Sequence, residues 1–189
     1  MSWQKITCCA ALTIFVLAGA TMAGEISAKL SGPGMVNDST IKAGEPVSLD
    51  LYFSNDTIRR GVSVGFKFTS PDIKNIIHVA DSGNGVNEAG DVKGVNGWQD
   101  KSVFDLTGVI VSANDWDGNL PDTVGLVGIV IKKRWQPHDL EKKISINFIV
   151  PDPGTLSVDS TFFPPGGKWM YDNNEKPGWD GPYTFKVVK

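Results

Sequence analysis

Apolar and polar residues alternate along three long segments of the chain. In residues 47–53 the apolar side chains are Val47, Leu49, Leu51 and Phe53. The same period of two recurs in residues 62–68 and 144–150. Successive side chains of a strand point to opposite faces, so this period predicts strands with one face on a core and the other in water, as in antiparallel sheets.

Six further segments carry a weaker strand signal, and Gly, Pro, Asp and Asn separate most of them. They are residues 26–30, 73–79, 103–111, 124–131, 155–162 and 183–188. No segment sustains a helical period over three turns, although residues 136–141 and 96–101 allow short helical turns. About nine strands and no long helix predict an all-β fold, an antiparallel immunoglobulin-like or jelly-roll β-sandwich. The expected common core is Leu51, Phe53, Phe66, Phe68, Ile146 and Phe148.

The first 23 residues have the composition of a secretory signal peptide. A short basic start ending at Lys5 precedes the uncharged apolar run of residues 6–20, which is shorter than a membrane span requires. We expect cleavage after Ala23, with Ala20 as the second choice. The remaining residues 24–189 are then one secreted β-sandwich domain, extracellular or periplasmic, without a membrane span.

Charge and cysteine content narrow the range of partners. Removal of Lys5 with the leader leaves 17 basic and 21 acidic side chains, a net charge of −4. There is no basic block, so nucleic acid is not an expected partner. Both cysteines, Cys8 and Cys9, lie inside the leader. The exported domain therefore relies on its core rather than on disulfides.

Three stretches together resemble cohesin-type domains of secreted bacterial proteins. AGEPVSL at residues 43–49 matches the entry to a cohesin strand, and GVSVGFKF at residues 61–68 matches the following strand before the turn Ser70-Pro71-Asp72. Residues 153–169 resemble a segment common in that broad group. The resemblance implies a cohesin-like sandwich that acts through protein contacts. A fold like that of carbohydrate-binding modules is similarly plausible, because the two folds are close relatives.

One acidic loop has oxygen ligands at alternate positions. Asp115, Asp117 and Asn119 flank Trp116 and Gly118, and Asp122 follows. Calcium takes six to eight oxygen ligands, which acidic loops of extracellular proteins provide. The same residues are also typical of an ordinary turn. Calcium is the one cofactor that the sequence suggests, and no other is expected.

The aromatic residues outside the alternating segments are candidate ligand contacts. Trp116, Trp169, Tyr171 and Trp179 lie in stretches rich in Gly, Pro and Asp. Tryptophan rings stack on sugars and are frequent contacts at protein interfaces. The alternative is that these rings cover the ends of the sandwich.

Three functions follow from these features. The first is a secreted, non-catalytic binding or scaffold domain that makes protein–protein contacts at or outside the cell surface. The second is a carbohydrate-binding module that recruits a polysaccharide through its loop tryptophans. The third is a hydrolase, for which His78 and His138 are the only histidines and no nucleophile-elbow or HExxH motif occurs. The sequence favours a protein that is not an enzyme.

Overall fold

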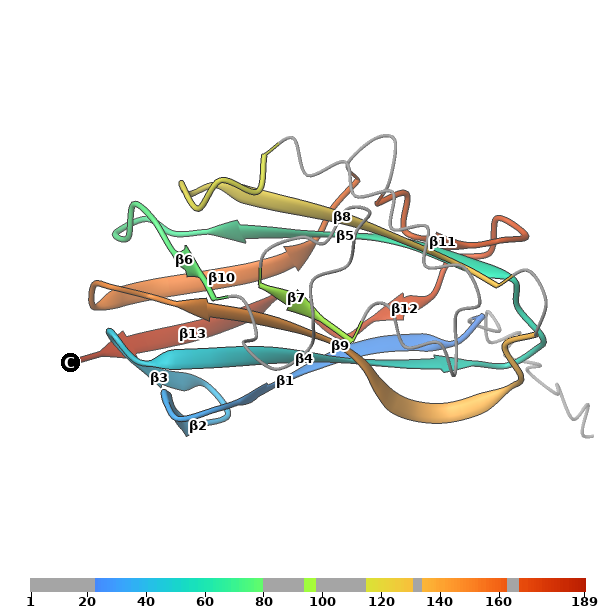
Figure 1. Ribbon diagram of the computed structural model, residues 1–189, viewed down its shortest axis with the longest axis horizontal. Coiled ribbons are helices and arrows are strands. Elements are labelled where there is room, and N and C mark those ends of the chain that lie inside the picture. The colour runs from blue at the N-terminus through green and yellow to red at the C-terminus, as the bar shows by residue number, and fades with distance from the viewer. Residues whose placement is uncertain (1–22, 80–93, 98–114, 131–133, 163–166) are drawn as a thin grey trace, which may run out of the picture.

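Two β-sheets packed face to face form the protein. The computed structural model describes residues 23–79, 94–97, 115–130, 134–162 and 167–189, and these contain strands and turns but no helix. The long strands run roughly along the long axis of the molecule (Figure 1). The all-β sandwich expected from the sequence is confirmed.

The first sheet, sheet A, has six strands in the order β12-β1-β4-β9-β6, with β7 also paired to β9. Its members are β1 (Glu25–Ser31), β4 (Pro46–Asn55), β6 (Ile77–His78), β7 (Val95–Asn96), β9 (His138–Ile149) and β12 (Gly178–Trp179). The pairings are antiparallel except for the short parallel pair of β1 with β12.

The second sheet, sheet B, has seven strands in the order β11-β5-β10-β13-β3-β2, with β8 on the other side of β5. Its members are β2 (Met35–Asn37), β3 (Thr40–Lys42), β5 (Gly61–Thr69), β8 (Asp122–Ile129), β10 (Gly154–Ser160), β11 (Met170–Tyr171) and β13 (Tyr183–Val188). Only β3 and β13 pair in parallel in this sheet.

The core lies between the inner faces of the two sheets. All six predicted core residues are buried: Leu51, Phe53, Phe66, Phe68, Ile146 and Phe148. The rings of Phe68 in sheet B and Phe148 in sheet A meet at 5.6 Å in a T-shaped contact. The alternation in the sequence therefore assigns the faces correctly.

Two local predictions need correction. Residues 138–141 are the start of β9 and not a helical turn, because β9 continues along β4 past a β-bulge to the pair Asn55–His138. The segment 73–79 forms only the two-residue strand β6 and an isolated bridge at Asn75. Asn96 lies in β7. The predicted strand at residues 103–111 lies outside the described residues.

Candidate functional site

The outer face of sheet A carries a polar cleft of about 390 Å³. We call it the sheet-A cleft. Its polar lining comes from β1, β4, β7 and β9: Ser31, Ser48, Asp50, Asn96, Lys142, Ser145 and Asn147. Pro33, Pro46, Val47 and Val79 complete the lining. The volume falls within the ~300–1,000 Å³ typical of small-molecule sites.

Strand register explains why these polar residues meet. In the pairing of β4 with β9, Ser48 is opposite Asn147 and Asp50 is opposite Ser145. In the pairing of β4 with β1, Ser48 is opposite Ser31. Residues directly opposite one another point to the same face, so three strands contribute neighbouring polar side chains. The alternation that buries Leu49 and Leu51 places Ser48 and Asp50 on this outer face.

Asp50 organises the centre of the cleft. It is only 6% exposed. One carboxylate oxygen accepts a hydrogen bond from Ser31 Oγ at 2.9 Å, and the other accepts from Ser145 Oγ at 2.6 Å. Lys142 Nζ lies 3.5 Å from the same carboxylate. Because both hydroxyl protons point at Asp50, the hydroxyl oxygens keep lone pairs that can accept from a ligand.

A hydrogen bond also links Ser48 and Asn147, the neighbouring pair of cleft residues on β4 and β9. Ser48 Oγ donates to Asn147 Oδ1 at 2.5 Å. This orients the Asn147 amide, whose nitrogen is a donor. The cleft therefore offers fixed donors and acceptors, together with one carboxylate and one ammonium group whose formal charges cancel.

The predicted aromatic residues lie elsewhere, packed against the core. Trp169 and Trp179 are half-buried, and each makes an edge contact with Phe66, at 5.6 and 5.7 Å. Their indole nitrogens donate to the Pro177 carbonyl and to Asp159. The centroids of these two rings lie 5.4 Å apart in an edge contact.

Tyr171 and Trp116 also make contacts inside the protein. Tyr171 is 1% exposed, and its hydroxyl donates to the Ser54 carbonyl at 2.6 Å, so it presents almost no surface to a ligand. Trp116 stacks on His78 at 3.8 Å and also contacts Phe68. Ligand binding by the four aromatic residues stays a prediction, and their packing favours the alternative that they cover the sandwich.

The acidic loop around Trp116 uses its oxygens within the protein. Asp117 accepts hydrogen bonds from the backbone and side-chain nitrogens of Asn119 at 2.8 and 2.9 Å. The backbone donor, and then the side-chain donor, of Asn119 hold the pKa of Asp117 below its ordinary value. Asp115 is exposed and its backbone pairs with Thr123. Within the described ranges no group of three or more His, Cys, Asp and Glu side chains is arranged to hold a metal ion. Calcium binding stays a prediction.

Asp122 and His78 form a buried polar pair under this loop. His78 Nε2 lies 2.9 Å from Asp122 Oδ2, and both side chains are buried. The same oxygen accepts from the Gly118 backbone nitrogen at 2.9 Å. Because His78 is also covered by Trp116, we assign this pair to holding the loop.

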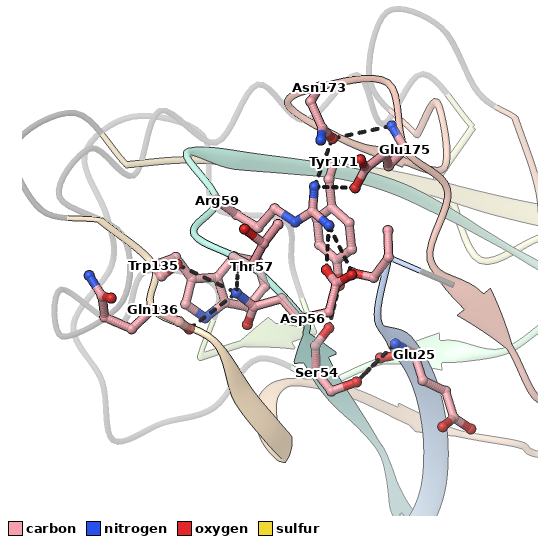
Figure 2. Close-up of polar contacts among 12 residues, drawn as sticks. Glu25, Ser54, Asp56, Thr57, Arg59, Trp135, Gln136, Tyr171, Asn173 and Glu175 are labelled. Carbon is pink, nitrogen blue, oxygen red and sulfur yellow. Dashed lines mark hydrogen bonds and ion pairs between the residues drawn. The ribbon is translucent and has the colours of Figure 1, made fainter. Parts of the chain in front are cut away.

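A buried arginine that the sequence did not suggest lies at the other end of β4. The side chain of Arg59 is inaccessible and lies over the Tyr171 ring at 4.7 Å. Its two terminal nitrogens reach Asp56 at 2.6 Å and Glu175 at 2.5 Å (Figure 2). Burial alone would lower the pKa of Arg59, but the hydrogen bonds to Glu175 and Asp56 raise it above the ordinary value.

Acidification should weaken the contact between Arg59 and Glu175. The hydrogen bond from Asn173, followed by that from Arg59, holds the pKa of Glu175 below its ordinary value. A lowered pKa gives stability that is present above the pKa of the unfolded chain and lost as pH falls through that of the folded chain. We expect the melting temperature of the wild type to fall more steeply between about pH 5 and 3 than that of Glu175→Gln. An equal fall of melting temperature with pH in the two proteins would contradict a stabilising contact between Arg59 and ionised Glu175.

Comparison with known proteins identifies no family. No protein-family model matches the chain, and no curated protein matches it. A crystal structure described as a "Putative membrane anchored protein" from Corynebacterium diphtheriae aligns with a TM-score of 0.38 and 11% sequence identity. The alignment covers 90% of this chain and 37% of that one, so this chain spans little more than a third of that length. A likeness this distant carries no argument, and the cohesin-like or carbohydrate-binding-module-like identity stays a prediction.

No described part of the chain forms a helix long and apolar enough to cross a membrane.

Proposed function

We propose that this protein is an exported, non-catalytic binding domain that takes a neutral polysaccharide in the sheet-A cleft. The observation that carries the proposal is the set of oriented polar groups around Asp50, on the rigid outer face of three paired strands. Export rests on the leader at the start of the sequence. This function corresponds to the second of the three inferred from the sequence, with the binding surface moved from the loops to the sheet.

The chemistry of the cleft favours a ligand rich in hydroxyl groups. A hydroxyl both donates and accepts, so it can donate to Ser31 or Ser145 oxygen and accept from Asn147 nitrogen. The carboxylate of Asp50 and the ammonium of Lys142 cancel formally, so a neutral ligand is favoured over an anionic one. Hydrogen-bonding groups already held in place lose little freedom on binding, which supports affinity.

Protein contact, the first function inferred from the sequence, has no comparable support. Among the residues that the structure describes, the exposed large apolar side chains lie on six different segments: Val36, Ile58, Ile77, Ile129, Leu140 and Phe162. Single exposed apolar residues are normal on protein surfaces and do not define an interface. We therefore retain protein contact only as an outcome of the tests below.

Binding should depend on side chains of the cleft and not on lysines elsewhere. We expect the exported protein to bind neutral oligosaccharides on a glycan array. Lys142→Ala and Asn147→Ala should each weaken calorimetric affinity for the strongest binder about tenfold, the equivalent of ~1.4 kcal/mol, because each removes a polar contact. Lys67→Ala is the matched control, since Lys67 is exposed on β5 of the opposite sheet.

Three results would contradict the proposal. The first is an array without a neutral glycan signal. The second is equal affinity of the cleft variants and Lys67→Ala. The third is loss of binding in Trp116→Ala and Trp179→Ala while the cleft variants bind normally, which would return the site to the loop tryptophans. A protein partner that competes with no glycan would support the protein-contact function instead.

A further inference from the structure

Ala23, the residue expected to end the leader, is part of the folded domain. It is only 4% exposed and belongs to the hydrophobic core cluster. Its carbonyl oxygen accepts a hydrogen bond from Arg59 Nη2 at 3.1 Å. A residue removed before folding would make none of these contacts in the exported protein.

The Ala23 carbonyl is one of the acceptors around a buried cation. Arg59 Nη2 also donates to Asp56, and Nη1 donates to Asn173 and Glu175 (Figure 2). A buried guanidinium needs acceptors, because an unsatisfied buried donor is costly. Cleavage after Ala23 would remove this carbonyl and leave a second cation, the new α-ammonium of Gly24, next to the site. Attraction to Asp56 would offset part of that cost, but Asp56 is already bonded to Arg59.

Next to Ala23, the backbone of Gly24 has a conformation that favours glycine. Its φ is +124°. A Cβ here would lie 2.2 Å from the Ser54 carbonyl oxygen, so only glycine fits. The Gly24 carbonyl accepts from Gly178 N at 2.8 Å, next to the pairing of β1 with β12.

We propose that signal peptidase cleaves the chain after Ala20, so that the exported protein begins at Thr21. The inference rests on the export included in the proposed function. The sequence Ala18-Gly19-Ala20 places small residues at both positions that signal peptidase reads. Water hydrolyses the peptide bond between Ala20 and Thr21, which leaves a carboxylate on Ala20 and an ammonium on Thr21. Ala23 and its contact with Arg59 are kept.

Intact-mass measurement tests the position of the cut. The full-length gene, with its own leader, is expressed in a bacterial host, and the exported protein is analysed by mass and N-terminal sequencing. We expect residues 21–189. A chain that begins at Gly24 would overturn the inference, and an uncleaved chain retained in the membrane would overturn export as well. If the chain begins at Thr21 but binds no glycan, the proposed function fails and the cleavage site stands.

Two matched leader variants separate the candidate sites without changing a described residue. Ala18→Leu places a large side chain at the third residue before the Ala20–Thr21 bond, one of the two positions where signal peptidase reads a small residue. Thr21→Leu alters the cut after Ala23 in the same way. We expect Ala18→Leu to abolish the product that begins at residue 21 and Thr21→Leu to leave cleavage after Ala20 intact. The reverse pattern would assign the cut to Ala23.

Discussion

Replacement of Phe148 by alanine should lower the free energy of unfolding by about 3–5 kcal/mol, the usual range for a buried phenylalanine. Phe148 is fully buried in β9, and its ring meets Phe68 of the opposite sheet at 5.6 Å. The substitution removes the ring and leaves a cavity that the two sheets only partly close. Urea denaturation of both proteins measures the difference.

Phe162→Ala is the matched control for this change. Phe162 follows β10 and is 64% exposed, so its removal should cost less than about 0.5 kcal/mol. Similar losses for the two variants, or a loss under about 1 kcal/mol for Phe148→Ala, would mean that the inner and outer faces of β9 are misassigned.

Asp122→Ala should be the most damaging change of a single polar side chain near the Trp116 loop. Asp122 is fully buried, and its carboxylate contacts the Gly118 nitrogen, the Thr123 nitrogen and His78. Removal leaves the buried Gly118 nitrogen without its acceptor, while the Thr123 nitrogen keeps the Asp115 carbonyl, so we expect a cost of about 1–3 kcal/mol. Thermal or urea unfolding gives the magnitude.

Asp117→Ala is the comparison for this prediction, because the Asp117 carboxylate is exposed and bonds to Asn119 within its own turn. We expect a much smaller loss of stability than for Asp122→Ala. Trp116 stacks on His78, so Asp122→Ala should also alter tryptophan fluorescence in the folded protein. Equal losses in the two variants would show that the buried pair does not hold the loop.

Alternation predicts the long strands because one face of each is buried. Val47, Leu49, Leu51 and Phe53 all lie in the core, as the period of two requires. The start of β9 carries no such signal, because His138, Asp139 and Leu140 follow Pro137 in a polar stretch without alternation. Pairing with β4, which is a tertiary contact, makes that stretch a strand.

The sheet-A cleft and the burial of Arg59 could not be predicted from the pattern within single strands. Ser48 and Asp50 are visible as the polar face of one strand, but their neighbours depend on the register of β4 with β1 and β9. Arg59 is followed directly by Arg60, and nothing in the sequence of that pair distinguishes the buried side chain from the exposed one. Its partner Glu175 lies more than a hundred residues away, so the contact depends on the fold.

Chemical-shift mapping by NMR tests the central claim most directly. The labelled protein is titrated with the neutral oligosaccharide that gives the strongest array response. We expect the largest shifts at the backbone amides of Ser48, Ser145 and Asn147, on the outer face of sheet A. Shifts confined to the amides around Trp116 and residues 168–181, or no shifts at saturating oligosaccharide, would contradict the assignment of the sheet-A cleft as the binding site.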